Sequence, residues 1–248
     1  KLSKKRMMSG MHALWSVGCF AGAGLFSILA KLGLGISQIA IIHCIIIFMI
    51  IFAFSRYFLP YKGASNGKAI AIPKGIVTLF GVLAVISFLG EGGMMDWSGV
   101  FLTEAKGVDL SLAGVGYAVF SAAMLIGRLI GDKVVQKLGE QRVVIFGGIV
   151  ASVGYIISIV FDNFFMMQFG FILLGFGAAN IVPVVFTLLG RQKEMPINSA
   201  VTAVTSMGYL GVMFGPALLG FIAHGIGIVT VFCILAGLFI LQAIVSSY

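Results

Sequence analysis

The chain has 248 residues, of which 60% are hydrophobic and only 10% are charged. A soluble globular domain is roughly half apolar and about a quarter charged, so this composition excludes an ordinary water-soluble fold and favours a lipid bilayer as the surroundings. The formal net charge of +8 comes from basic residues spread over several loops without an aromatic platform, which argues against a nucleic-acid-binding surface.

Long stretches without Lys, Arg, Asp or Glu recur along the whole chain. A transmembrane helix needs about 20 mostly apolar residues to cross the hydrocarbon core of a membrane. A membrane β-barrel strand would alternate polar and apolar residues, and these stretches do not alternate. The sequence therefore predicts an all-α, polytopic bundle of about eight transmembrane helices, over residues 8–31, 37–58, 75–102, 110–134, 142–161, 163–190, 197–222 and 226–248.

The basic residues lie almost entirely on one side of this bundle. Of the 16 Lys and Arg residues, all but Lys31 and Lys106 precede the first predicted helix or lie in every second loop after it. Loops rich in Lys and Arg remain in the cytoplasm, so we predict that both ends of this chain are cytoplasmic. Because the chain begins with Lys in a basic segment, we also expect a longer protein with further helices upstream.

One predicted loop differs from the others in length and composition. Residues 59–74, LPYKGASNGKAIAIPK, combine Pro, Gly, Ser, Asn and three lysines, which is typical of a linker. We therefore predict two bundles, residues 1–58 with two helices and residues 75–248 with six.

The helix predicted over residues 75–102 carries two carboxylates, Glu91 and Asp96, in apolar surroundings. A charged side chain at the membrane centre costs at least about 2.5–3.5 kcal/mol, so it usually faces water or a partner. Helical periodicity puts Glu91 on one face with Ser87 and puts Asp96 on the opposite face. We therefore predict Glu91 as the main candidate for proton coupling or substrate binding and Asp96 as the second. A structural hydrogen bond is the alternative for each.

Polar side chains recur at helical spacing on further predicted helices. Each of them alone more often bonds to a neighbouring helix than to a solute, but several such faces together make a shared cavity credible. The candidates for lining a cavity for a polar solute are Ser87, Tyr117, Ser121, Asn180, Thr202, Ser206 and Tyr209.

Glycine and proline within the predicted spans bear on helix packing. Small residues let helices approach closely in lipid, and a proline removes a backbone donor and can kink a helix. The residues predicted to pack or bend helices are Gly92, Gly93, Pro183, Gly211, Gly215 and Pro216.

The sequence contains no glycine-rich phosphate-binding motif and no His, Cys or carboxylate grouping with the spacing of a metal site. No nucleophile stands beside a base at matched depth. We therefore predict no cofactor, no metal, no catalytic residue and no enzymatic activity. Any work that the protein does would draw on a gradient.

Residues 127–142, GRLIGDKVVQKLGEQR, resemble the cytoplasmic G-x-x-x-D-[RK]-x-G-[RK] signature of the major facilitator superfamily. Residues 175–186 resemble the tenth helix of that family, and residues 208–221 resemble its penultimate helix. The segment EGGMMDWSGVFL resembles the seventh helix of bacterial members of the fucose-permease-like, sugar-porter-like branch. The resemblance implies that the chain covers family helices five to twelve, with the central cytoplasmic loop at 59–74. It also implies a cytoplasmic gate at Arg128, Asp132, Lys133 and Arg142.

The resemblance further implies secondary active transport by alternating access. The expected substrate is a small polar solute such as a sugar, moved in symport with protons through a bacterial inner membrane. The expected partners are the solute, protons and lipid, and the full-length protein is expected to be a monomer. A drug or metabolite efflux carrier of the same superfamily and a non-transporting membrane scaffold are the alternatives.

Overall fold

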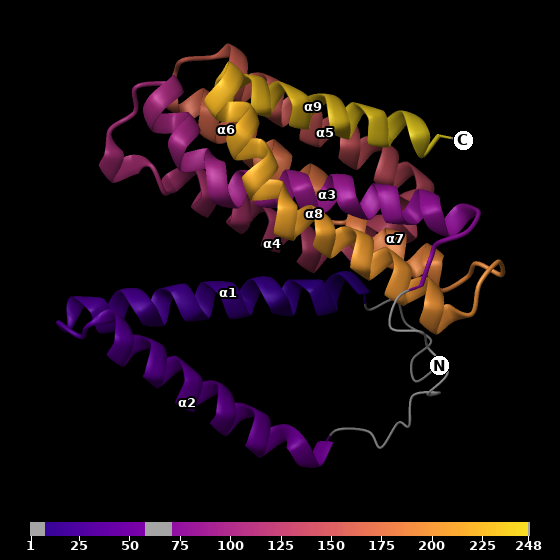
Figure 1. Ribbon diagram of the computed structural model, residues 1–248, viewed down its shortest axis with the longest axis horizontal. Coiled ribbons are helices and arrows are strands. Elements are labelled where there is room, and N and C mark those ends of the chain that lie inside the picture. The colour runs from indigo at the N-terminus through magenta and orange to yellow at the C-terminus, as the bar shows by residue number, and fades with distance from the viewer. Residues whose placement is uncertain (1–7, 58–70, 248) are drawn as a thin grey trace. The chain divides into compact units, whose positions relative to one another are not determined.

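The computed structural model describes residues 8–57 and 71–247, and the regular structure in these ranges is entirely helical (Figure 1). Its elements in chain order are α1 (Met8–Lys31), α2 (Ile36–Phe54), η1 (Ser55–Tyr57), α3 (Ile76–Val100), η2 (Phe101–Ala105), η3 (Leu110–Leu112), α4 (Val115–Leu138), α5 (Glu140–Val160), α6 (Phe164–Ala178), α7 (Ile181–Leu189), α8 (Ile197–Ile226) and α9 (Ile228–Val245). Here η2 is a π-helical turn that continues α3, and η1 and η3 are 3₁₀ turns.

The predicted all-α membrane bundle is confirmed. Six helical stretches in the described ranges are long and apolar enough to cross a membrane, and one of them, Phe164–Leu189, comprises α6 and α7. With that stretch counted once, α1–α9 correspond to the eight predicted spans. The largest change in a boundary is at the start of α4, which begins at Val115 rather than at residue 110.

The chain divides into two compact units, residues 14–67 and residues 1–13 with 68–248. In the smaller unit, α1 and α2 are joined by a short turn in which Gly33 has φ +84°, a conformation that glycine adopts readily. The ring of His43 in α2 bonds to the carbonyl of Ile39 at 2.8 Å and to that of Gly22 in α1 at 3.2 Å. The predicted linker lies mostly outside the described residues, so the division at 59–74 remains a prediction.

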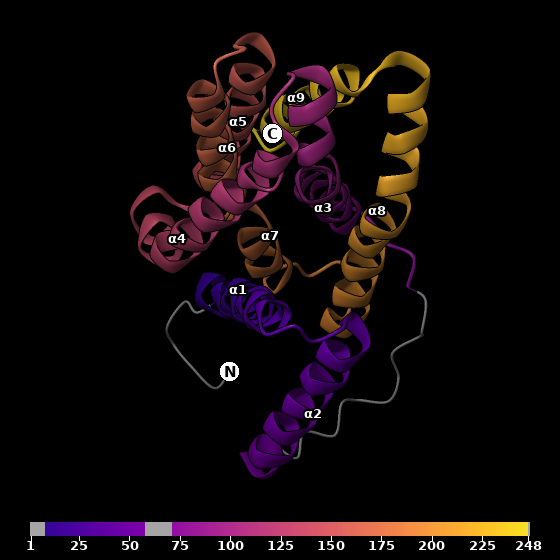
Figure 2. The same cartoon turned by 90° about the vertical axis from the view of Figure 1, so that its left-hand side faces the viewer.

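In the larger unit, α5 packs against α6 and α9, α3 packs against α8, and α4 packs against α6. Figure 2 shows α5 beside α6 and α3 beside α8. Glycines make the contact between α5 and α6 possible. A Cβ atom built on Gly154 would lie 2.5 Å from the carbonyl oxygen of Gly170, and one on Gly170 would lie 2.6 Å from that of Gly154. Small residues at such positions let helices in lipid gain packing contacts along their backbones.

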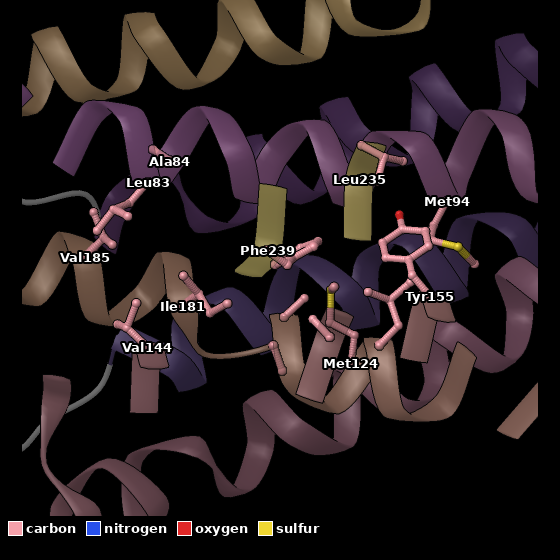
Figure 3. Close-up of a cluster of buried hydrophobic side chains, with 14 of the residues drawn as sticks. Leu83, Ala84, Met94, Met124, Val144, Tyr155, Ile181, Val185, Leu235 and Phe239 are labelled. Atoms are coloured by element: carbon pink, nitrogen blue, oxygen red, sulfur yellow. The ribbon is translucent and has the colours of Figure 1, made fainter. Parts of the chain in front are cut away.

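Aromatic side chains fill the centre of this unit, where α3, α5 and α9 meet. Tyr155 lies among Met94, Leu235 and Phe239 (Figure 3). Its ring meets that of Phe232 edge-on, with the centroids 5.4 Å apart. Aromatic pairs of this kind contribute about 0.5–1.5 kcal/mol beyond their burial. This core fixes the middle of α3, the part of the helix that carries Glu91.

Lys106 is one of the two basic residues that the sequence places on the side opposite to all the others. Its ammonium group lies 2.6 Å from Oδ1 of Asp162 and 2.7 Å from the carbonyl oxygen of Ile159, and its side chain is 7% exposed. It therefore joins the segment after α3 to the end of α5. This contact gives Lys106 a structural role that does not depend on which side of the membrane it faces.

Candidate functional site

A partly buried ion pair joins α3 to α4. Nη2 of Arg128 lies 3.1 Å from Oε2 of Glu91, and the two side chains are 6% and 19% exposed. An arginine side chain stays protonated in a protein, and a buried charge is tolerated only beside a partner or hydrogen-bonding groups. Two charges that lie 37 positions apart in the sequence thus meet inside the bundle.

The helix predicted over residues 110–134 ends four residues later than expected, and the next helix begins two residues before residue 142. Helix α4 continues to Leu138 and α5 begins at Glu140, so that Gly139, with φ +85°, alone separates them. Arg128 is therefore a mid-helix residue. Gly127 and Gly131 lie within this helix and serve close packing, because glycine is compatible with a helix when a neighbouring helix needs the space.

The other predicted gate residues lie nearer the ends of these helices. Asp132 and Lys133 follow Arg128 in α4, and Arg142 lies in the first turn of α5. Lys133 and Arg142 are exposed, and Asp132 is half-buried. A gating role for these residues remains a prediction.

Helix α6 ends beside Arg128. The carbonyl of Ala179 accepts a hydrogen bond from Nε of Arg128 at 3.3 Å. In an uninterrupted helix this carbonyl would accept from the N–H of residue 183, but residue 183 is a proline and has none. The next side chain, Asn180, donates from Nδ2 to the carbonyl of Gly127 at 2.9 Å. The interrupted helix therefore contacts α4 at two consecutive residues.

Two glycines of α4 make room for this junction. A Cβ atom on Gly127 would lie 2.7 Å from the Cβ of Ala179. One on Gly131 would overlap the amide oxygen of Asn180 and lie 2.6 Å from its Cγ. The Gly127–Gly131 spacing is thus the reason that the junction of α6 and α7 reaches the backbone beside Arg128.

Glu91 has one oxygen on Arg128 and a second oxygen, Oε1, that is buried and has no hydrogen-bond partner among the described residues. The next residue, Gly92, borders open space, since an added Cβ would find no atom within 4 Å. On the other side, the hydroxyl of Tyr155 donates to the carbonyl of Gly90 at 2.9 Å and fixes the backbone there. The second oxygen is therefore available to hold a proton.

The face of α3 that carries Ser87 is interior packing, because Ser87 and its neighbours on that face, Met94 and Ser98, are at most 1% exposed. The side chain of Gln242 in α9 donates from Nε2 to the Ser87 hydroxyl at 3.2 Å. Helical periodicity correctly groups Ser87 with Glu91, but the face they share is turned into the bundle, and Glu91 lies at its margin. Ser87 thus joins α3 to α9 and does not line an open cavity.

Besides Thr202, four of the predicted cavity residues remain accessible in this unit. Tyr117 and Ser121 are half-buried on α4, and Ser206 and Tyr209 are exposed on α8. The ring of Tyr209 stacks on that of Phe88, one turn before Glu91 and Gly92 on α3, with the centroids 6.2 Å apart. These hydroxyl groups can hydrogen-bond a polar solute.

Three further candidates have other surroundings. The Thr202 hydroxyl donates to the carbonyl of Asn198 in its own helix at 2.9 Å. Asn180 is 7% exposed and belongs to the junction with α4. Asp96 directly precedes Trp97 on α3, and its side chain is exposed. Their roles in binding or coupling remain predictions.

A groove of about 430 Å³ lies between α3 and α8, and its lining is apolar. A Cβ atom on Gly215 would lie 2.6 Å from Leu89, so this glycine lets α8 approach α3. On another side of α3, a Cβ atom on Gly93 would lie 2.6 Å from Leu235, so this glycine lets α9 approach α3. Pro216 lies inside α8, which continues past it to Ile226. The residues lining the groove are Val85, Leu89, Met207, Leu210, Gly211, Phe214, Gly215 and Leu218, which suit an apolar chain better than a polar solute.

Sequence reasoning missed Tyr155, Gln242 and the Ala179 carbonyl. Gln242 was detectable, because an amide in an otherwise apolar span needs a partner. The open carbonyl was detectable from Pro183, which stands four positions after it. Tyr155 gave no signal, since a tyrosine in an apolar helix is ordinary packing.

The chemistry open to this site is proton binding and hydrogen bonding. Glu91 can gain and lose a proton, whereas Arg128 keeps its charge. In the ranges that the structure describes, no group of three or more His, Cys, Asp or Glu side chains is placed to hold a metal ion.

Comparison with known proteins identifies the family. The profile of the Major Facilitator Superfamily matches residues 79–248. An uncharacterized MFS-type transporter of Yersinia pestis is 43% identical over 227 residues, which are 90% of this chain and 59% of that protein. Membrane protein MosC of Rhizobium meliloti is 26% identical and is covered to 55%. This chain thus spans less than two thirds of the length of these relatives.

The fold agrees with this assignment. The crystal structure of the human organic anion transporter MFSD10 (TETRAN) matches 70% of this chain and 42% of its own, with a TM-score of 0.60 and 18% sequence identity. At that identity the likeness concerns the fold alone. The profile match over residues 79–248 shows that the chain belongs to the major facilitator superfamily, a family of membrane transporters and not of enzymes.

Proposed function

We propose that the protein is a secondary active transporter that moves a small polar, sugar-like solute by alternating access in symport with protons, and that Glu91 carries the coupled proton. The observation that supports this most is the partly buried Glu91–Arg128 pair, in which one carboxylate oxygen bonds to the guanidinium and the other has no partner among the described residues.

The physical basis is that the two protonation states of Glu91 hold α3 and α4 together differently. As a carboxylate, Glu91 forms a charge-assisted hydrogen bond with Arg128, which is about twice as strong as a neutral one. As a carboxylic acid it loses that charge, and the link between the two helices weakens. A carrier that alternates between two arrangements of its helices can use such a change to bind a proton in one arrangement and release it in the other.

The solute would meet the hydroxyl groups of Tyr117, Ser121, Ser206 and Tyr209. Carbohydrate-like molecules are recognised through hydrogen bonds and through stacking on aromatic rings. The exposed ring of Tyr209, stacked on Phe88, offers such a surface one turn from Glu91. The apolar groove between α3 and α8 offers no comparable polar contact.

We place the protein in a bacterial inner membrane, as its bacterial relatives suggest. Basic residues lie after α2 and α7 and near the junction of α4 and α5, and these ends would be cytoplasmic by the positive-inside rule. Cysteine accessibility to an impermeant thiol reagent at residues 139 and 162 would test this orientation, because the two positions should react from opposite sides.

The test of function is solute-driven proton movement. The protein, expressed from its complete reading frame, would be reconstituted into vesicles containing a pH-sensitive dye and supplied with L-fucose, D-galactose or D-glucose. We expect at least one sugar to carry protons into the vesicles in the wild type. Glu91→Gln should abolish the proton signal, and Asp96→Asn, a matched change five residues later on the same helix, should retain it.

Two results would count against the proposal. If the Glu91→Gln variant moved protons with the sugar as the wild type does, Glu91 would not be the coupling residue. If none of the sugars moved while apolar cations were extruded, the efflux alternative would replace the sugar-like substrate.

A further inference from the structure

The end of α6 provides a backbone acceptor inside the bundle. Pro183 has no N–H, so the carbonyl of Ala179, four residues earlier, lacks its usual helical donor and instead accepts from Nε of Arg128 at 3.3 Å. We propose that Pro183 is a positioning residue: by withholding a competing N–H, it leaves this carbonyl free to hold the Arg128 guanidinium in the orientation that directs Nη2 at Glu91. This inference rests on the proposed coupling role of Glu91.

The geometry of the guanidinium makes the contact effective. Arginine presents its N–H donors in one rigid plane, so a hydrogen bond at Nε fixes the direction in which Nη2 can donate. In this structure Nε donates to Ala179 while Nη2 donates to Oε2 of Glu91 at 3.1 Å. The carbonyl and the carboxylate thus hold two donors of the same group.

A second contact keeps the acceptor in place. Asn180 donates from Nδ2 to the carbonyl of Gly127 at 2.9 Å, on the residue before Arg128. The Cβ atom of Ala179 occupies the space that a side chain at Gly127 would need. The interruption between α6 and α7 is therefore anchored to α4 at Gly127, next to the Arg128–Ala179 hydrogen bond.

The groups around Glu91 make its protonation sensitive to how Arg128 is held. Of the elements packed around the middle of α3, α4 contributes the guanidinium of Arg128, and α5 contributes the hydroxyl of Tyr155. Asn180, between α6 and α7, contributes a neutral amide, and so does Gln242 on α9. Helix α8 contributes the phenol of Tyr209, and α3 itself carries Asp96. A nearby cation favours the ionised form of a carboxyl group, so loosening Arg128 should let Glu91 take up its proton at a higher pH.

A chemical label can measure that change without any solute. An apolar carbodiimide reacts with protonated carboxyl groups, and Glu91 is partly exposed beside the open space at Gly92. The full-length protein would carry Asp96→Asn, so that Glu91 is the carboxyl group followed on α3. The extent of labelling of its peptide would be measured by mass spectrometry from pH 5 to pH 9.

Pro183→Ala restores an N–H that competes with Arg128 for the Ala179 carbonyl. We expect the midpoint of labelling to move to higher pH by about half a unit to one unit, which corresponds to a three- to tenfold change in proton affinity. Pro216→Ala restores an N–H in the interior of α8 and should leave the midpoint within 0.2 pH units of the wild-type value. This limit corresponds to a change of about one and a half-fold in proton affinity. Pro183→Val, closer to proline in volume, gives a second test if the alanine variant folds poorly.

The outcomes separate the two proposals. If Arg128→Gln raises the labelling midpoint but Pro183→Ala and Pro183→Val leave it at the wild-type value, the positioning role is refuted and the coupling role of Glu91 is untouched. If Pro216→Ala shifts the midpoint as far as Pro183→Ala does, the effect is general to helix prolines, and the inference also fails. Failure of the coupling role would appear elsewhere, as proton-coupled uptake that survives in Glu91→Gln.

Discussion

The junction of α6 and α7 with α4 depends on the absence of a side chain at Gly131. In Gly131→Ala the new methyl group would overlap the amide oxygen of Asn180 and lie 2.6 Å from its Cγ and 2.9 Å from its Nδ2. Asn180 is 7% exposed, so it cannot turn away without disturbing its neighbours. It would have to give up its hydrogen bond to Gly127 or push the two helices apart.

The magnitude follows from three contributions. Forcing extra volume into a packed site costs about 1–3 kcal/mol. Loss of the Asn180–Gly127 hydrogen bond adds about 0.5–1.5 kcal/mol. Replacing glycine by alanine inside a helix returns about 0.8–1 kcal/mol. The last two nearly cancel, so we expect Gly131→Ala to lower the free energy of unfolding by about 1–3 kcal/mol.

The matched control is Gly92→Ala in α3, where an added Cβ meets no atom within 4 Å. This variant should gain up to about 1 kcal/mol from helix propensity alone. Both variants would be unfolded reversibly in mixed micelles of dodecyl sulfate and a mild detergent, with the free energies compared at one detergent fraction. Equal stability of the two variants would refute the close approach of the junction to α4.

Three further predictions concern the same unit. Arg128→Met should lower the free energy of unfolding by about 3–5 kcal/mol, because it leaves the Glu91 carboxylate without its cation. Unfolding titrations measure this loss, and a variant as stable as the wild type would contradict the ion pair. Tyr155→Phe should cost about 0.5–1.5 kcal/mol in the same assay through the lost hydrogen bond to Gly90, and an unchanged stability would show that this bond contributes nothing. Lys106→Met should lower the free energy of unfolding by about 1.5–3 kcal/mol, because it removes the bonds of Lys106 to the end of α5. Faster amide hydrogen exchange at the end of α5 would be the independent measurement.

Much of the fold follows from the sequence because apolar runs of membrane length have few alternatives. Spans such as Phe164–Leu189 are marked at both ends by polar residues, and the bilayer fixes their length. Glu91 also stands out in the sequence, since a carboxylate among apolar residues needs an explanation. These inferences use only local sequence.

The rest depends on which helices meet and on how each is turned. In the sequence Arg128 resembles a residue of a cytoplasmic gate, and only the packing of α4 against α3 and α6 brings it to Glu91. Ser87 falls on the correct helical stripe, but periodicity does not say whether that stripe faces a cavity or α9. Rotation about the helix axis is decided by the sum of many packing contacts, which no single residue in the sequence reveals.

Ending a helix in the middle of the bundle has an electrostatic consequence. Helix α6 stops at Ala178, and the aligned peptide dipoles of such a helix leave about half a negative charge at its carboxyl end. The Ala179 carbonyl, which touches Arg128, is part of that end. The backbone thus supplies a fixed partial countercharge to the guanidinium, one that no proton can remove. When Glu91 becomes neutral, this countercharge remains beside Arg128.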